Sequence, residues 1–299
     1  MTMSETNQTV KTEQETKRHT IERSSELQYV RFSRLNRALH ATMIVSFISL
    51  ALTGMTLKFS YTGWAHVLSR LLGGFEMAGF VHRVGAFFMI SIFIIHIVDL
   101  FRRKRREYGT WRAMLMGRDS MLPSKRDLSD FIGNVKWFIG RGPRPQYGRW
   151  TYWEKFDYFA VFWGMMVIGS TGLTLWFPEF FTRFIPGWFL NVATIIHSDE
   201  ALLAVGFIFT VHFFNTHLRP EKFPMDIVVF TGRMSIEDLR EDKPDEYEQL
   251  VREGRLEERL AEPYPPIVVR TIKTFGWIAL GLGFSIVIWI IYAMLFAYK

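Results

Sequence analysis

The chain has 299 residues, of which 49% are hydrophobic, and it carries a formal net charge of +7. It contains no cysteine, which excludes disulfides, thiolate-bound zinc, iron–sulfur clusters and covalently attached c-type haem. Mean hydropathy is only +0.08 despite the large apolar fraction, so apolar stretches must alternate with very polar ones. We expect no nucleic-acid partner, because the sequence contains no recognisable soluble basic domain with aromatic platforms.

Apolar segments near 20 residues long recur along the chain, and each is long enough to cross about 30 Å of hydrocarbon as a helix. They are residues 39–59, 77–101, 156–177, 193–217 and 274–296. The pattern predicts an all-α integral membrane protein, a bundle of four spanning helices with an additional C-terminal span. The first span has no features of a cleaved signal peptide and is interpreted as an uncleaved insertion signal.

The polar stretches between these spans suggest a division of the chain. We expect residues 1–34 to be a cytoplasmic and largely disordered N-terminus, because they are hydrophilic and poor in aromatic residues. Residues 35–234 would form the four-helix domain, with a cytoplasmic loop at 102–155. Residues 235–273 are a charged connector, and residues 274–299 contain the last span.

Positive charge is distributed very unevenly among the loops. Residues 102–155 contain fourteen Lys or Arg and begin with RRKRR, whereas the two neighbouring short loops contain only Arg70 and Arg183. Cytoplasmic loops of membrane proteins carry the excess of Lys and Arg. The sequence therefore predicts a multi-pass protein of a bacterial inner membrane, with a cytoplasmic N-terminus and a periplasmic C-terminus.

Histidines occur at two depths of the predicted bundle. His82 and His197 lie near the outer ends of spans two and four, whereas His40, His96 and His212 lie near inner ends. At 100° per residue, the 14- and 15-residue spacings within spans two and four return to within about 40° and 60° of one face. Two pairs of imidazoles at two depths suit two haem b groups, each of which needs two axial nitrogens and no thioether bond.

Other interpretations of these polar residues stay open. A single histidine in a membrane more often forms a hydrogen bond or lies on a proton path than binds a metal. A haem-free transporter or proton relay would use the histidines together with Asp199 and Glu200. A stand-alone transmembrane reductase would hold haem but have no quinone site. A zinc or non-haem iron site would need its ligands at one depth, which the spacing does not predict.

Four segments of the chain resemble a known family. RLNRALHATMIVSFISLALTGM, GFVHRVGAFFMISIFIIHIV, STGLTLWFP and IIHSDEALLAVGFIFTVHFF resemble, in order and spacing, the spans of the di-haem cytochrome b (gamma) subunits of respiratory formate dehydrogenases and membrane-bound hydrogenases. The resemblance covers roughly residues 31–240. It implies an electron-transfer subunit, without catalytic residues of its own, that connects the quinone pool with a peripheral redox subunit. An iron–sulfur or multihaem cytochrome c subunit on the outer face is the expected partner, with membrane lipid around the spans.

The resemblance also implies a ligand set. The iron of the outer haem would be bound by His82 and His197, and that of the inner haem by His40 and His212. His96 is the rival of His40, because ligands drawn from only two helices are the pattern of quinol–cytochrome c reductases. The 15-residue spacing in span four is one residue longer than we expect in the family.

Further residues adjoin these presumed ligands. Gly54 follows His40 by 14 residues and would leave room for the edge of a macrocycle between helices. Arg83 directly follows a ligand and, like Arg34 and Arg37, is a candidate to pair with a haem propionate.

A quinone site is expected beside the inner haem. The resemblance places part of it just before span three, where Thr151 occupies the position at which we expect Asn. An imidazole or carboxylate near the headgroups can pass the two protons that quinone reduction requires. The predicted quinone-site residues are His217, Asn215, Arg219, Thr151 and Glu154.

Overall fold

The computed structural model describes residues 27–219, 222–223 and 225–297. The predicted disorder of the N-terminus concerns mainly residues 1–26, which lie outside this range. The described part of the predicted N-terminal segment contains a short strand, β1 (Gln28–Val30), directly before the first spanning helix.

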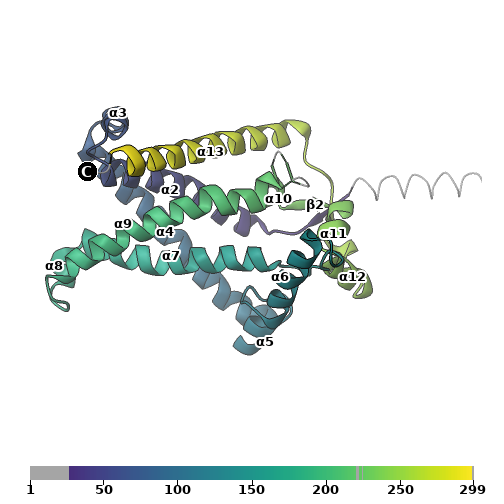
Figure 1. Ribbon diagram of the computed structural model, residues 1–299. Coiled ribbons are helices and arrows are strands. Elements are labelled where there is room, and N and C mark those ends of the chain that lie inside the picture. Colours follow the sequence, from purple (N-terminus) through teal and green to yellow (C-terminus); the bar gives the residue numbers. More distant parts are fainter. Residues whose placement is uncertain (1–26, 220–221, 224, 298–299) are drawn as a thin grey trace, which may run out of the picture.

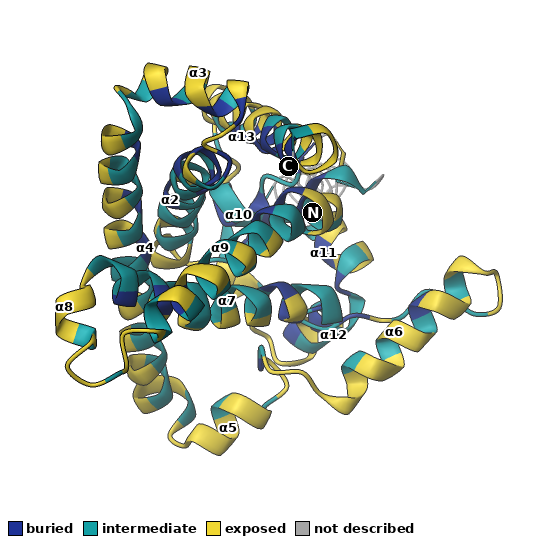
Figure 2. Cartoon of the chain, turned by 60° about the vertical axis from the view of Figure 1, so that its left-hand side comes forward, coloured by how far each residue is buried: buried dark blue, intermediate teal, exposed yellow. Residues whose placement is uncertain are grey.

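Within the described part of the chain, five helices are long and apolar enough to cross a membrane, which confirms the predicted all-α membrane bundle with five spans. Each begins or ends beyond the predicted apolar segment, because helical hydrogen bonding continues into the polar flanks. The helices are α2 (Arg34–Lys58), α4 (Phe75–Arg103) continued by η1 (Lys104–Tyr108), α7 (Tyr152–Trp176), α9 (Phe189–Phe207) continued by η2 (Ile208–His212) and η3 (Phe214–Leu218), and α13 (Pro266–Tyr292) continued by η5 (Ala293–Ala297). Their outward faces are exposed (Figure 2), as suits contact with lipid.

Shorter elements lie at the two ends of the bundle (Figure 1). One end carries the C-terminus and two helices, α3 (Gly63–Leu72) and α8 (Pro178–Phe181). The other end carries α5 (Trp111–Met116), α6 (Lys125–Phe138), α10 (Val228–Thr231), α11 (Ile236–Asp242), α12 (Pro244–Arg252) and η4 (Glu257–Arg259). The positively charged loop and the charged connector therefore share one end of the molecule.

The fifth span is packed into the bundle. Its buried residues Leu280, Ile286 and Ile290 belong to one apolar core with residues of α2 and of the end of α9. Two glycines of α13 lie tight against the bundle, because a Cβ atom would collide with the Met225 side chain at Gly276 and with the Phe209 ring at Gly283. The opposite face of α13, including Ile288, is exposed. The helix thus has one face for the bundle and one for lipid or another subunit.

The connector folds around a small sheet. Strands β2 (Arg233–Ser235) and β3 (Leu260–Ala261) flank β1 in the antiparallel order β2-β1-β3. Tyr29 of β1 pairs with Met234 and with Leu260, and its side chain is fully buried in an apolar core with Leu239 and Leu250. We call β1 and residues 228–261 the connector unit. Its core explains how so charged a segment takes up a defined structure.

Buried ion pairs connect this unit to the first turn of α7. Arg31 donates a hydrogen bond to Glu246 over 2.9 Å, and Arg149 donates to the same carboxylate over 2.8 Å. Lys243 donates to Glu154 over 2.5 Å. Burial lowers the pKa of Lys243 to about 8, although the Glu154 carboxylate raises it. Charges this deeply buried need such partners, because an unpaired one would be costly.

Candidate functional site

Two histidines face each other at the end of the bundle that carries α3 and α8. His82 lies near the start of α4 and His197 near the start of α9, as their sequence positions predict. Their ring centroids are 6.2 Å apart, and the ring planes are inclined at 79°. An imidazole nitrogen binds a metal at about 2.0–2.1 Å, so two imidazoles on one metal have ring centres roughly 6 Å apart. At the observed separation, His82 and His197 would be able to hold one metal ion between them.

Hydrogen bonds fix the tautomer of both rings. Nδ1 of His197 lies 3.0 Å from the carbonyl oxygen of Ile168, which can only accept, so Nδ1 carries the proton. Nδ1 of His82 lies 3.0 Å from the hydroxyl of Thr53, which donates its own proton to the Ser49 carbonyl over 2.7 Å. This hydroxyl therefore accepts from His82. Both Nε2 atoms keep a free lone pair, which is the arrangement that metal-binding histidines adopt.

Two glycines allow these rings to lie against neighbouring helices. A Cβ atom at Gly172 of α7 would lie 2.9 Å from Cε1 of His197, and one at Gly54 of α2 would lie 3.2 Å from Cε1 of His82. The structure thus places Gly54 beside His82, the histidine expected near the outer end of span two. Arg83, which follows His82, is exposed.

A second group of histidines lies toward the connector end. Nδ1 of His212 lies 2.9 Å from Oδ2 of Asp157, so a carboxylate holds this ring and leaves Nε2 free. His40 lies within electrostatic range of His212 and His217. Nδ1 of His40 and Nδ1 of His217 are buried and have no hydrogen-bond partner among the described residues. Buried nitrogens without a protein partner are typical of a site that binds a cofactor or substrate.

The end of α9 winds as a π-helix, with hydrogen bonds from residue i to i+5. A π turn contains one residue more than an α turn. The 15-residue step from His197 to His212 therefore covers about the same rotation as 14 residues of a regular α-helix, and the two side chains lie within about 40° of one helix face. This accounts for the additional residue in span four. His217 follows His212 by five residues, one π turn, and therefore lies on the same face.

Comparisons with known proteins agree with this geometry. Residues 3–117 match the family model described as prokaryotic cytochrome b561. The chain is also 22% identical over 177 residues to the cytochrome b556(Fdn) subunit of the nitrate-inducible formate dehydrogenase of Escherichia coli K12, which covers 59% of the chain and 72% of that subunit. The corresponding subunits of E. coli O157:H7 and Shigella flexneri match equally well. Both comparisons therefore point to similarity with prokaryotic membrane cytochrome b subunits. The cytochrome b561 family, which residues 3–117 match, implies binding of haem b.

The rival candidate ligand, His96, has a different environment. Nε2 of His96 lies 2.9 Å from the hydroxyl of Tyr158 in α7, and the two rings are 5.7 Å apart. The nitrogen that would have to face a haem is therefore already hydrogen-bonded. No such bond occupies Nε2 of His40 within the described part of the chain.

The predicted quinone-site residues fall into two groups. Thr151 and Glu154 form the capping box at the start of α7, where Thr151 donates to Glu154 over 2.8 Å and Lys243 holds the same carboxylate. His217 and Asn215 lie together in η3, and Arg219 follows this segment. The Arg219 guanidinium lies 5.0 Å from the ring centre of Trp153, so the end of η3 adjoins the first turn of α7. No hydrogen bond or ion pair joins Glu154 to His217 among the described residues.

Several residues of the site were not predicted from the sequence. Thr53 and the Ile168 carbonyl orient the outer pair, and Asp157 orients His212. Asp157 offered a signal, since a carboxylate in an apolar span usually has a functional partner. Asp199, considered for a proton relay, instead accepts from Lys58 over 2.8 Å near the outer pair.

Proposed function

We propose that this protein is a cytochrome b subunit that binds two haem b groups and transfers electrons between the membrane quinone pool and a peripheral redox subunit. The facing pair of His82 and His197 carries the proposal, because both rings are locked with Nε2 free at a separation that fits one iron. Haem b bound at such a pair supplies one-electron transfer. A second pair near the other end of the bundle would let electrons cross the bilayer.

The inner pair would be His40 and His212. His212 is held by Asp157 and has Nε2 free, and His40 lies within electrostatic range of it. The hydrogen bond between His96 and Tyr158 favours His40 over His96. His96 would then connect α4 to α7 through its hydrogen bond with Tyr158. This bond satisfies an imidazole that would be costly to leave unpaired in a membrane.

His217 would exchange protons with the quinone. It lies on the His212 face of the π-helical segment, at the membrane boundary, and its Nδ1 is buried without a partner among the described residues. A neutral imidazole in this position can accept a proton from the connector side and deliver it to a quinone oxygen. Asn215 and Arg219 would help to position the ring. Thr151 and Glu154 would contribute indirectly, by fixing the start of α7.

Orientation follows from charge. The connector unit and the loop rich in Lys and Arg lie at one end, which we place in the bacterial cytoplasm. The N-terminus would be cytoplasmic and the C-terminus periplasmic. The opposite end, next to the outer pair, exposes the aromatic residues Phe180, Phe184 and Trp188. Such a surface suits docking of an iron–sulfur or multihaem cytochrome c subunit, since aromatic residues are enriched at interfaces.

Haem content tests the proposal directly. A pyridine haemochrome assay and a dithionite-reduced minus oxidised spectrum of the purified chain should give two haem b per chain. His82→Leu and His40→Leu should each leave one, whereas His96→Leu should leave two. Folded protein without haem would contradict the proposal in favour of a proton relay. Two haems that quinol cannot reduce would indicate a reductase without a quinone site.

A further inference from the structure

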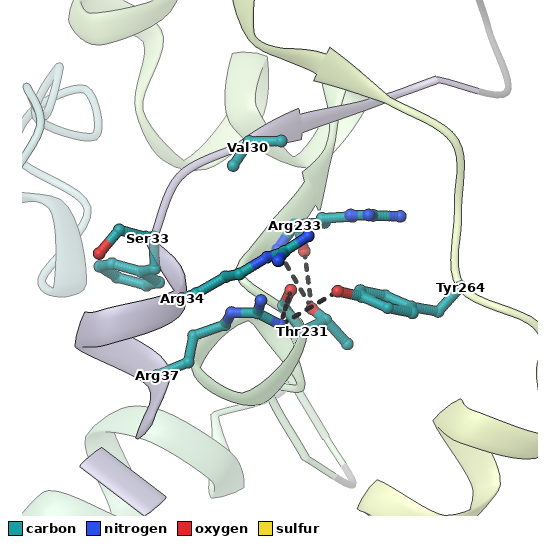
Figure 3. A pocket seen from close by; sticks show the side chains of 8 residues that line it. Val30, Ser33, Arg34, Arg37, Thr231, Arg233 and Tyr264 are labelled. Atoms are coloured by element: carbon teal, nitrogen blue, oxygen red, sulfur yellow. Dashed lines mark hydrogen bonds between the residues drawn. The ribbon is translucent and has the colours of Figure 1, made fainter. Parts of the chain in front are cut away.

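A pocket opens where the first and last spans meet the connector unit. It has a volume of about 230 Å³. Figure 3 shows Arg34 and Arg37 reaching into it from α2, with Arg233 from β2 and Tyr264 from the chain before α13. Its lining residues are Val30, Phe32, Ser33, Arg34, Arg37, Thr231, Arg233 and Tyr264.

The charge of this arginine pocket is not compensated. It is lined by three guanidinium groups and no carboxylate, and none of the three forms an ion pair within the described residues. Three cations around one concavity repel one another, and an anion shared between them would relieve that repulsion. The pocket also adjoins the first turn of α2, where the positive end of the helix dipole adds to the field.

The individual side chains are held in place but keep donors free. Arg37 donates through Nη1 to the Thr231 carbonyl over 2.9 Å and to the Tyr264 hydroxyl over 3.1 Å, while its Nε is buried without a partner in the described structure. The Arg233 guanidinium lies 4.0 Å from the ring centre of Tyr264 and donates to the carbonyl of Glu262. Arg34 is exposed at the mouth. The pocket is therefore built from fixed walls with spare N–H groups.

We propose that the arginine pocket binds a phosphate group, presented by the headgroup of an anionic lipid. Guanidinium forks match phosphate oxygens in paired hydrogen bonds. Arg34 is the first residue of α2, and Tyr264 precedes Pro266, at which α13 begins. The pocket thus lies where two spans enter the bilayer, the depth at which headgroups are found. A phosphate there bridges α2 and β2 and fastens the connector unit to the membrane surface.

The test uses the full chain, purified and reconstituted in nanodiscs of phosphatidylcholine with or without phosphatidylglycerol. Native mass spectrometry after release into detergent should show phosphatidylglycerol retained by the wild-type chain. Arg34→Gln combined with Arg233→Gln should reduce retention at least tenfold. Arg37 is left unchanged because it also holds the backbone at Thr231. Arg105→Gln combined with Arg106→Gln removes the same charge from exposed positions of η1 and should retain lipid like the wild type.

Two further measurements identify the ligand. Inorganic phosphate that raises the unfolding temperature of the wild type but not of the pocket variant, with no lipid retained, would assign the pocket to a free phosphate compound. Equal lipid retention and equal phosphate response in wild type and pocket variant would overturn the proposal. So would a pocket variant that retains lipid but shows a shifted inner-haem potential, because the arginines would then serve a haem propionate.

Discussion

Asp157 accepts a hydrogen bond from Nδ1 of His212 over 2.9 Å, between the second turn of α7 and the π-helical end of α9. The second carboxylate oxygen of Asp157 is buried and has no partner among the described residues. The carboxylate therefore interacts with the imidazole alone. It fixes the ring orientation and makes Nε2 a stronger donor to a metal.

Replacing Asp157 by Asn should weaken the inner haem site. Partners of ligating residues typically contribute about 10- to 100-fold to metal affinity. We expect the variant to lose its inner haem on dilution or dialysis, at concentrations where the wild type keeps both, as measured by haemochrome assay. Asp99→Asn removes another carboxylate from an apolar helix and should leave both haems bound. Full retention in the Asp157 variant would mean that packing alone orients His212.

Gly172 offers a test of the outer pair. Because a Cβ atom there would lie 2.9 Å from Cε1 of His197, Gly172→Val should push the imidazole out of line and leave one haem per chain. Gly169→Val lies one turn earlier on the same helix, where a Cβ atom meets nothing within 4 Å, and should retain two. Haem content and the reduced spectrum give the readout. Two normal haems in the Gly172 variant would show that His197 is not fixed by this contact.

His217→Gln separates proton transfer from haem binding. We expect two haems and an unchanged reduced spectrum, with the rate of haem reduction by quinol lowered by about 10²-fold or more, the usual contribution of an acid–base group. Thr216→Val provides the control, since among the described residues the Thr216 hydroxyl bonds only to the His212 carbonyl. Loss of a haem in the His217 variant would instead indicate that this residue is a ligand.

The connector end should respond to acid. Burial raises the pKa of Asp245, but hydrogen bonds donated by Arg118 and Arg126 outweigh it and hold that pKa below 3.8. A carboxyl group whose pKa is lower in the folded state contributes stability above its unfolded pKa, and this contribution disappears as the pH falls through the folded value. The unfolding temperature of the wild type should therefore decrease as the pH falls from about 5 to about 3.

Calorimetry of Asp245→Asn in detergent measures this contribution. The variant should unfold at lower temperature at pH 6 and show a smaller further decrease toward pH 3 than the wild type. Glu237→Gln, at an exposed position of α11, should follow the wild-type curve. Parallel curves for the Asp245 variant and the wild type would place the acid sensitivity elsewhere.

The five spans could be predicted from the sequence because a chain crossing hydrocarbon must satisfy its backbone hydrogen bonds within a helix. Hydropathy locates the apolar part of each helix but not its ends. Helical hydrogen bonding continues into polar residues such as Arg34 and, beyond α4, as far as Tyr108. The predicted bounds are therefore too short.

The sequence positions of His82 and His197 predicted that the two rings lie at the same depth, but not which residues contact them. Thr53 and Ile168 belong to helices other than those of the histidines they hold, and one sequence does not reveal how helices rotate against each other. The π turns before His212 and His217 have no compositional signature either. The extra residue in span four is understandable only once the i to i+5 bonding is seen.

Charge in the connector was equally ambiguous. A run of charged residues predicts a solvated segment, yet Arg31, Glu154 and Lys243 are drawn together from three distant parts of the chain. Composition does not distinguish a charge that will be buried with a partner from one that stays in water. Only the tertiary structure supplies the partner.

The sheet β2-β1-β3 has a consequence for biosynthesis. β1 leaves the ribosome before any span, whereas β2 follows the fourth span and β3 comes shortly before the fifth. Until β2 and β3 have been synthesised, the Tyr29 side chain has no apolar core to pack in, and both edges of β1 lack hydrogen-bond partners. The connector unit can therefore close only on a chain whose first four helices have already been synthesised, and a chain truncated before Arg233 would leave its N-terminal strand unpaired.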